Sequence, residues 1–432
     1  MSPASPGPNP ARDAAARLLE AVLERRRTLE EGLDGLPEGI APRDRAAGHR
    51  IAAAALRRLG SLDVVLEPYL RRAPPEPARR ALRVGAADLL VLGTAPHAAV
   101  SAAVSVAPRP LAGLANAVLR KVAAEGAAAL GDLDGERLDT PAWLWSSWHA
   151  AYGAEGVRAV ARAHRAPAPL DLSLAPGAPP PEGAEALPTG TARLPAGTRM
   201  ADLPGYAEGA FWAQDAAAAL PARLLGVRPG ERVADLCAAP GGKTAQLVHA
   251  GASRVVAVER DAGRAARLRE NLARLRLAER VEVVEADATA WDGGGGGGER
   301  YDAVLLDAPC SATGTIRRHP DVVHLKRASD VAQQAGLQRR LVEAAARLLA
   351  PGGRLVFATC SLQPEEGEAH SAHIASLGLV PDPIRPEEVP GLEAAVAPAG
   401  TLRTRPDLWA ERGGMDGFFA GRWRRPTDTR GA

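Results

Sequence analysis

The sequence predicts an α/β domain with a doubly wound parallel sheet, preceded by an all-α domain and a small connecting subdomain. Two patterns predict this arrangement. From about residue 10 to 126, apolar residues recur at helical spacing, and from 209 to 424 short β-rich runs alternate with helical segments. With 432 residues, 46% of them hydrophobic, the chain is long enough for two or three domains with their own cores.

The first predicted domain is helical and covers residues 10–128, after a disordered N-terminus at 1–9. Its pattern is clearest at 14–23, where apolar residues recur every three or four positions. Asp44 can cap the next helix, and glycine or proline breaks separate the later ones. Further helices are expected at 45–59, 61–70, 75–92, 97–106 and 113–124.

The connecting subdomain, predicted at 129–204, gathers tryptophans in a chain that is only 3% aromatic. Two helices are expected there, at 141–152 and 155–164, followed by strand-like segments rich in proline and glycine. The α/β domain then covers 205–426 and leaves a tail at 427–432. Its expected strands are 232–236, 254–258, 281–285, 302–306, 354–359 and 417–423, and its expected helices are 214–225, 243–250, 261–275, 330–349 and 364–377.

Composition argues against several classes of function. Three cysteines without a C-x-x-C pair favour neither a disulfide framework nor a structural zinc site, and they indicate a reducing, cytoplasmic compartment. The N-terminus lacks the pattern of a secretory signal, and no membrane span is expected. A net charge of +2 gives no bulk signal for nucleic acid, and arginines spread along the chain fit GC-rich coding better than phosphate binding. We expect a monomer with no metal and no membrane partner.

Two further features are interpreted as structural. Six consecutive glycines, Gly293 to Gly298, are expected to form an insertion in a surface loop. His370 and His373 have the i, i+3 spacing of a metal-binding pair, but no third ligand is near in sequence. We therefore interpret the two histidines as part of a helix surface.

The strongest ligand signal joins the first strand of the α/β domain to its first helix: Asp235-Leu236-Cys237-Ala238-Ala239-Pro240-Gly241-Gly242-Lys243-Thr244. Small residues and two glycines let a ligand approach the backbone, and the N-terminus of the following helix favours negative charge. A phosphate-binding P-loop would need glycine at the position of Cys237. The loop therefore fits a nucleoside cofactor pocket better, with contacts expected from residues 237–243.

Acidic residues end the next three predicted strands. Glu259 stands where an acid hydrogen-bonds ribose hydroxyls in related sheets. Asp287 is expected near the adenine, and Asp307 beside the methyl donor. Together with the glycine loop they predict S-adenosylmethionine as the cofactor, although each acid alone would also fit a helix cap.

Two cysteines lie just past predicted strands, at the sheet edge where ligands bind. Cys310 stands in Asp307-Ala308-Pro309-Cys310-Ser311, and Cys360 stands in Ala358-Thr359-Cys360-Ser361. A helix that starts near Pro364 would ease ionisation of the second thiol. On position alone, a buried thiol with no chemical role stays open for both, and Cys237 also fits a small residue packed beneath the cofactor loop.

A small basic cluster follows the Cys310 motif. Its members are Arg317, Arg318 and His319, in a predicted loop. They are candidates for contacts with the phosphates of a nucleic acid. A solvated run of charge fits the same three residues equally well.

These motifs resemble the Sun family of S-adenosylmethionine-dependent RNA cytosine-5 methyltransferases. The N-terminal helices resemble a NusB-like, RNA-binding domain, and the combination resembles the layout of bacterial 16S ribosomal RNA methyltransferases. The resemblance implies a Rossmann-like catalytic domain after the helical one. The segments that carry it are 209–215, 235–244, 307–311, 358–362 and 414–419 in the α/β half, and 97–100 and 116–120 in the helical half.

The resemblance implies methylation of carbon 5 of a cytosine in RNA, expected to be 16S ribosomal RNA, through a covalent cysteine–cytosine intermediate. Cys360 would attack carbon 6, Cys310 would assist product release, and Asp307 would steady the base or the cofactor amine. DNA cytosine-5 enzymes instead attack with the cysteine of a Pro-Cys motif, which here is Cys310, but the Thr-Cys-Ser motif favours Cys360. The target base must be unstacked or single-stranded to reach such a pocket.

Two other functions stay open. One is an RNA-binding regulator with an inactive methyltransferase-like domain, against which the intact glycine loop, the strand-end acids and both cysteines argue. The other is a small-molecule methyltransferase, which the attached helical domain and the pair of thiols disfavour. The target nucleotide is not encoded in any recognisable pattern of the sequence.

Overall fold

The computed structural model describes residues 9–294 and 298–427. Most of the predicted N-terminal segment, most of the predicted tail and half of the glycine tract lie outside the described residues. The chain divides into two compact units. The first comprises 1–167 and 316–327, and the second comprises 168–315 and 328–432.

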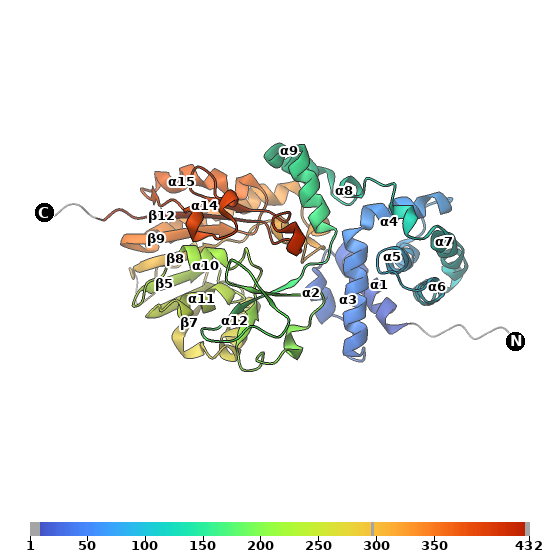
Figure 1. Cartoon of the computed structure of the whole chain (residues 1–432), viewed down its shortest axis with the longest axis horizontal. Helices are drawn as coiled ribbons and strands as arrows, with labels where there is room; N and C mark the ends of the chain where they lie inside the picture. The colour runs from blue at the N-terminus through green and yellow to red at the C-terminus, as the bar shows by residue number, and fades with distance from the viewer. Residues whose placement is uncertain (1–8, 295–297, 428–432) are drawn as a thin grey trace. The chain divides into compact units, whose positions relative to one another are not determined.

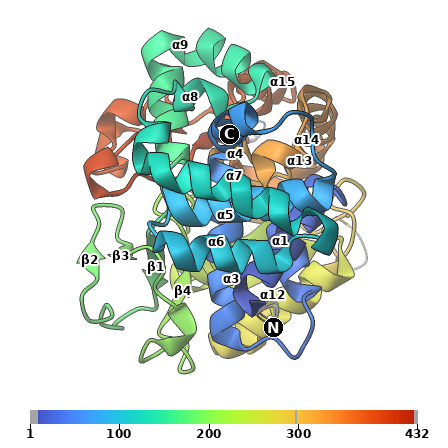
Figure 2. The same ribbon diagram turned by 90° about the vertical axis from the view of Figure 1, so that its right-hand side faces the viewer.

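The first unit is a helical bundle, as the apolar spacing predicts. Figure 2 shows α5, α6 and α7 running side by side. Leu18, Leu19, Ile51, Leu56 and Leu82 are among its fully buried side chains. The helices are α1 (Pro10–Leu23), α2 (Leu29–Asp34), α3 (Pro42–Arg57), α4 (Leu59–Leu66), α5 (Glu76–Leu90), α6 (Pro96–Val106), α7 (Ala112–Glu125), α8 (Gly135–Leu138), α9 (Ala142–His164) and, within 316–327, α13 (Val322–Leu325).

Glycine shapes this bundle at two points. A Cβ added to Gly48 of α3 would lie 2.6 Å from Cβ of Ala14, so the glycine allows α1 and α3 to approach closely. Gly153 has φ 72° and ψ 179° and interrupts α9. This break lies where the sequence predicted a gap between the helices 141–152 and 155–164.

The second unit contains the predicted sheet, and the α/β fold class is confirmed. Its parallel strands are ordered β7-β6-β5-β8-β9, and β12, β10 and β11 extend the sheet beyond β9 (Figure 1). The strands are β5 (Arg232–Leu236), β6 (Arg254–Glu259), β7 (Val281–Glu285), β8 (Tyr301–Asp307), β9 (Leu349–Thr359), β10 (Val380–Pro381), β11 (Leu402–Thr404) and β12 (Phe418–Arg424). The helices of this unit are α10 (Leu220–Leu224), α11 (Gly242–His249), α12 (Ala262–Arg274), α14 (Ala328–Leu348) and α15 (Ser371–Ser376).

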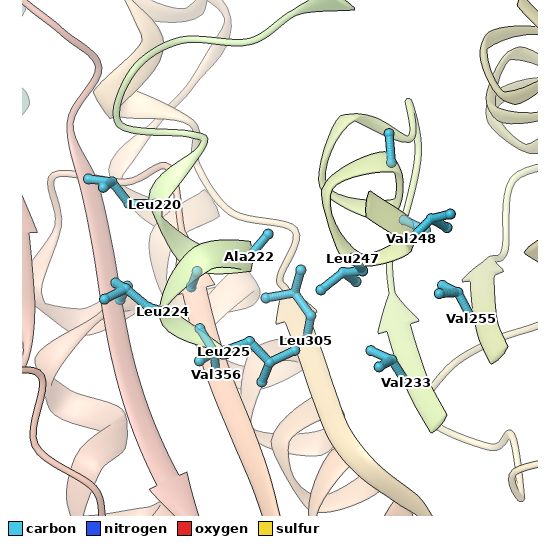
Figure 3. Close-up of a cluster of buried hydrophobic side chains, with 14 of the residues drawn as sticks. Leu220, Ala222, Leu224, Leu225, Val233, Leu247, Val248, Val255, Leu305 and Val356 are labelled. Atoms are coloured by element: carbon cyan, nitrogen blue, oxygen red, sulfur yellow. The ribbon is translucent and has the colours of Figure 1, made fainter. Parts of the chain in front are cut away.

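Helices cover both faces of the sheet because successive strand residues point to opposite sides. Val233, Leu305 and Val356 pack on one face against α10 and α11, as Figure 3 shows. On the other face, Val304 and Leu355 pack in a second cluster with side chains of α14 and α15. Both faces of the inner parallel strands are therefore buried, which explains their nearly continuous apolar sequences, whereas the edge strand β7 buries only Val281.

A small antiparallel sheet also belongs to the second unit, with strand order β2-β3-β1-β4 (Figure 2). Its strands are β1 (Leu170–Leu174), β2 (Glu185–Ala186), β3 (Ala192–Leu194) and β4 (Phe211–Ala213). The region predicted as a connecting subdomain is thus divided: its helices group with the first unit and its strands with the second.

Three details differ from the prediction. The last strand, β12, runs antiparallel to β9 and also pairs antiparallel with β11. It follows β11 along the chain, whereas a parallel strand would be connected through a helical crossover. The helix expected at 214–225 is limited to α10. The helix expected at 364–377 is replaced by two 3-10 turns, Pro364–Glu366 and Glu368–His370, followed by α15.

In the part of the chain that the structure describes, no helix is long and apolar enough to cross a membrane.

Candidate active site

The two cysteines meet at the carboxyl ends of neighbouring strands. Cys310 lies just past β8 and Cys360 directly after β9, and these strands pair in parallel with Asp307 opposite Ala358. The two sulfur atoms are 3.4 Å apart, and neither cysteine forms a disulfide. Residues 50 positions apart in the sequence therefore form one pair of thiols.

The surroundings of the pair raise the pKa of the Cys310 thiol. A hydrogen bond with Cys360 and burial raise this pKa well above its ordinary value, and Glu366 adds to the shift. Either thiol can donate the hydrogen bond between them, and the raised pKa favours an arrangement in which Cys310 keeps its proton. The expected help from a helix start at Pro364 is absent, because only a three-residue 3-10 turn begins there.

The third cysteine is in a different environment. Cys237 has a left-handed backbone (φ 61°), which non-glycine residues rarely adopt. Burial, together with the charges of Glu259 and Asp307, raises the pKa of its thiol. A thiol that keeps its proton is a poor nucleophile, so Cys237 fits the wall of a pocket and not a reactive group.

A pocket with a cavity volume of about 70 Å³ opens beside these strand ends. The predicted cofactor residues Cys237, Glu259 and Asp287 line it together, and Pro309 brings in the Cys310 motif. Its other lining residues are Val258, Arg260, Arg264, Ala286, Ala288, Leu337 and Leu341. Apolar side chains on one side and two acids on the other suit a nucleoside.

Glu259 supplies the most direct sign of a missing partner. Its side chain is only 3% exposed. Oε1 accepts a hydrogen bond from the Asp261 backbone NH at 3.2 Å, and Arg264 lies 3.6 Å from Oε2. Within the described residues, Oε2 accepts no hydrogen bond, although it is buried. Since buried polar atoms are normally satisfied, the two hydroxyls of a ribose would complete this site.

The carboxylate of Asp287 is held in place as a hydrogen-bond acceptor. Thr289 donates to its Oδ1 from both the backbone NH (2.9 Å) and the hydroxyl (2.7 Å). These bonds hold the pKa of Asp287 below its ordinary value. A carboxylate that stays ionised at this pocket can accept hydrogen bonds from an amine such as that of adenine.

The rest of the predicted cofactor loop lies beside the pocket wall. Ala238, Ala239, Pro240, Gly241, Gly242 and Lys243 are not among the lining residues. Gly241 has φ 104°, and a Cβ there would meet Leu268 at 2.5 Å, so only glycine fits this turn. Arg264 of α12 donates to the Ala239 carbonyl at 2.9 Å and ties the loop to the next helix.

Lys243 and Asp307 form an ion pair at 2.7 Å. The ammonium also lies 5.1 Å from the centre of the Phe418 ring. Both predicted residues thus meet at the strand edge, where the lysine neutralises the acid beside Cys310.

Asp235 and Glu366 are two buried acids to which the sequence assigned no role. Asp235 is 1% exposed, and burial raises its pKa to about 7, while the Thr244 hydroxyl donates to it at 2.6 Å. Glu366 is fully buried between the two cysteine loops, and burial raises its pKa as well. The only sequence signal for Glu366 was its place among acids just after the Cys360 motif, which did not distinguish it from Glu365 or Glu368.

The basic cluster is not wholly available for phosphate. Arg317 is 1% exposed within the helical unit, and its carbonyl accepts from Arg57 at 3.0 Å. The predicted contact with RNA is therefore wrong for this side chain, because it is packed inside the unit. Arg318 and His319 are exposed and keep that interpretation open.

One of the two histidines after Cys360, His370, also differs from expectation. His370 is 1% exposed and not part of a surface, because Nε2 pairs with Gln338 Oε1 at 2.9 Å and its ring packs edge-on to Phe357. His373 lies 3.2 Å from Glu343. Among the described residues, no cluster of three or more His, Cys, Asp or Glu side chains has the arrangement of a metal site.

Comparison with known proteins decides the family. Residues 222–423 match the 16S rRNA methyltransferase RsmB/F family, and residues 9–124 match the NusB family. Ribosomal RNA small subunit methyltransferase B of Xanthomonas campestris pv. campestris is 39% identical over 82% of this chain and 85% of its own length. The chain belongs to the RsmB/F family. It is an RNA methyltransferase with an N-terminal NusB domain, as the sequence motifs predicted.

Other members and structures agree with this assignment. The enzyme of the same name from Pseudomonas putida is 35% identical to this RsmB/F chain over 94% of it and 96% of its own length. The crystal structure of PH0851 has a TM-score of 0.71 at 22% identity and covers 98% of this chain and 100% of its own. NSun6 from Pyrococcus horikoshii with SFG has a TM-score of 0.55 at 19% identity, over 67% of this chain and 99% of its own. At these identities the two structures support the fold.

Proposed function

We propose that the protein methylates carbon 5 of a cytosine in 16S ribosomal RNA through a covalent cysteine–cytosine intermediate. The observation that carries this proposal is the pair of thiols, 3.4 Å apart at the ends of β8 and β9. The pocket that can hold a nucleoside opens beside the same strand ends, and Pro309 borders it next to Cys310. A thiol pair has no role in simple methyl transfer to an amine, whereas a cytosine ring needs covalent activation.

The methyl donor is S-adenosylmethionine, which supplies a methyl group on a positively charged sulfur. Glu259 would accept hydrogen bonds from the ribose hydroxyls, and Asp287 would accept from the adenine amine. Asp307 would hold the base or the cofactor amine, with its charge moderated by Lys243 at 2.7 Å. Each of the three acids would therefore act from the strand end at which it lies.

The reaction can be followed bond by bond. The Cys360 thiolate would attack carbon 6 of the cytosine, and the electrons of the ring double bond would move to carbon 5. Carbon 5 would then take the methyl group, while the bond between that methyl group and the positively charged sulfur of the donor breaks and its electron pair stays on that sulfur. A base then removes the proton from carbon 5, the electrons restore the ring double bond, and the S–C bond breaks. Cys310 stays next to the leaving sulfur with its proton in place, which suits a group that assists release.

The elevated pKa of Cys310 supports the choice of nucleophile. Attack requires a thiolate, and a thiol that donates its hydrogen bond toward Cys360 Sγ stabilises negative charge on that sulfur. If Cys310 were the attacker, a thiol whose pKa is raised by its hydrogen bond with Cys360 and by burial would have to ionise. We therefore propose Cys360 as the nucleophile.

Methyl transfer to ribosomal RNA tests the proposal. Purified protein, labelled S-adenosylmethionine and unmodified 16S RNA should give one methylated cytosine, located by bisulfite sequencing, and a deletion strain should lack it. Cys360→Ala should abolish transfer. Normal turnover by that variant would overturn the assignment of the nucleophile, and methyl groups on atoms other than carbon 5 would overturn the reaction. We expect the enzyme to act as a monomer in the cytoplasm.

A further inference from the structure

A fully buried carboxylate lies between the loops of the two cysteines. Glu366 has no solvent exposure. Its Oε1 accepts from the Ser311 backbone NH at 2.8 Å, and its Oε2 accepts from the Ser311 hydroxyl at 2.5 Å. On the other side, the Ser361 hydroxyl donates to the same Oε2 at 2.5 Å. Ser311 follows Cys310 and Ser361 follows Cys360, so one side chain joins both cysteine loops.

A second layer supports this carboxylate. Gln338 of α14 donates from Nε2 to Glu366 Oε1 at 3.3 Å and to the Pro309 carbonyl at 2.9 Å. His370 holds the Gln338 amide in place through Oε1. The Thr359 hydroxyl donates to the Glu366 backbone carbonyl at 2.9 Å. The residues before and after both cysteines are therefore linked to one acid.

The charge of Glu366 needs an explanation beyond packing. A buried carboxylate costs several kcal/mol unless it is paired or well hydrogen-bonded. Among the described residues it forms no ion pair, and its charge is balanced by hydrogen-bond donors alone, four in number. Apolar side chains would join the two loops at lower cost. A carboxylate at this point instead orders two serine hydroxyls and one backbone NH, all beside the thiols.

We propose that Glu366 is a positioning residue that sets the separation of the Cys310 and Cys360 thiols. The proposal rests on the proposed function for its catalytic meaning, but its geometric part stands alone. By holding Ser311 and Ser361 on one pair of oxygens, Glu366 keeps the two sulfurs within reach of each other. The loops are also joined by the Gly314 backbone NH, which donates to the Cys360 carbonyl at 3.0 Å, and by the Thr313 hydroxyl, which accepts from the Leu362 backbone NH at 3.0 Å. Without Glu366 these bonds remain, but the links through Ser311 and Ser361 beside the sulfurs are lost, and Cys310 is held less firmly near Cys360 Sγ.

Glu366→Gln is the direct test. The glutamine side chain has the shape of the glutamate side chain, but its NH2 group is a hydrogen-bond donor and would face other donors. Glu365→Gln is the matched control, since Glu365 is the exposed neighbour. The first readout needs no cofactor or RNA: diamide takes two electrons and two protons from the thiols as the Cys310–Cys360 disulfide forms. We expect cross-linking about tenfold slower in Glu366→Gln and unchanged in Glu365→Gln.

The second readout is methyl transfer. Glu366→Gln should lower kcat by about tenfold or more, with KM for S-adenosylmethionine within about twofold of the unsubstituted enzyme, because the cofactor pocket is lined by other residues. Ser361→Ala removes the hydroxyl that links Glu366 to the Cys360 loop, together with its contacts with the Ser311 and Thr313 hydroxyls and the Gln363 backbone NH, but it leaves both Ser311 links to Glu366 in place and guards against a folding defect. It should slow cross-linking in the same direction by a smaller factor.

The outcomes separate the two proposals. Unchanged cross-linking in a folded Glu366→Gln protein, or an equal loss of kcat and of cofactor affinity, would overturn the positioning role. Slower cross-linking in a protein that transfers no methyl group to RNA even when unsubstituted would leave the positioning role intact and defeat the proposed function.

Discussion

At the scale of single residues, the proposed chemistry depends on the protonation of Cys310. Two thiols 3.4 Å apart cannot both ionise readily, because the second negative charge would face the first. The hydrogen bond with Cys360 and burial raise the pKa of Cys310, which favours the protonated form of this thiol. The neighbouring sulfur is then the one that receives a hydrogen bond and can carry charge.

The unsatisfied oxygen of Glu259 leads to a binding prediction. Glu259→Gln should weaken S-adenosylmethionine by about 10- to 100-fold, since a hydrogen bond to a charged group contributes about 1.5–3 kcal/mol. Isothermal titration calorimetry measures the change directly. Glu285→Gln, at the exposed end of β7, is the control and should bind as the unsubstituted protein does. Equal affinities for both variants would show that Glu259 does not contact the ribose.

Asp235 leads to a prediction about pH. Its folded-state pKa of about 7 exceeds the value of about 3.9 expected in the unfolded chain. Between these values the folded protein binds a proton that the unfolded chain has lost, so the free energy of unfolding falls as the pH rises from about 4 to about 7. Asp235→Asn removes this titration.

Thermal unfolding of both proteins across that pH range tests the point. The decline of Tm with rising pH should be shallower in Asp235→Asn than in the unsubstituted protein. Parallel curves would mean that Asp235 is already ionised when folded, stabilised by the Thr244 hydroxyl.

At the scale of elements, close packing of α1 on α3 depends on one missing side chain. Gly48→Ala should destabilise the helical unit by about 1–3 kcal/mol, because its Cβ would lie 2.6 Å from Ala14 Cβ and 2.9 Å from the Ala11 carbonyl oxygen. Gly113→Ala is the control: it is an exposed glycine in α7 with nothing within 4 Å of an added Cβ. Urea unfolding should show a loss for the first variant and a gain of up to about 1 kcal/mol for the second. Similar stabilities would contradict the packing argument.

The sequence predicted those elements whose apolar pattern is strong. Strands 232–236 and 281–285 have the predicted bounds, the first with Val233 to Leu236 buried and the second, at the edge of the sheet, with only Val281 buried. The short helix α2 was missed, although Thr28 and Glu31 form a capping box that the sequence displays. The 3-10 turns after Cys360 were misjudged because acids after a proline are equally typical of an α-helix start.

The sequence likewise predicted only part of the candidate site. Strand ends fix where Cys310, Cys360, Glu259 and Asp287 lie, so a pattern of strands followed by reactive residues was enough to pair the two cysteines and to place the two acids in one pocket. Glu366 was not predictable, since its burial depends on contacts with Ser311 and Gln338 that come from distant segments. The sequence around a single acidic residue does not indicate whether its side chain is buried.

At the scale of the whole molecule, the helical unit includes a segment from the middle of the α/β half. Residues 316–327 belong to the first unit. Asp321 accepts from the Leu29 backbone NH at 3.2 Å, and His324 Nε2 lies 2.9 Å from the Leu56 carbonyl. The sequence did not predict this arrangement, because a pattern along the chain does not show which domain a loop packs against.

A fragment experiment tests this membership. Residues 1–167 expressed alone should unfold at a lower temperature than the helical unit of the full chain, because the surface that buries Val322 and Val323 becomes exposed. A synthetic peptide of residues 316–327 should raise the Tm of the fragment, while a scrambled peptide should not. No difference between the two peptides would show that the segment does not bind there specifically.

The most direct measurement of the central claim is a covalent protein–RNA adduct in denaturing gels. Cys310→Ala, with S-adenosylmethionine and 16S RNA, should accumulate an adduct that survives denaturation, because attack proceeds and release does not. Adding Cys360→Ala should abolish it. An adduct that persists in the double variant, or that forms with Cys360→Ala alone, would contradict the assignment of Cys360 as attacker and Cys310 as the group that assists release.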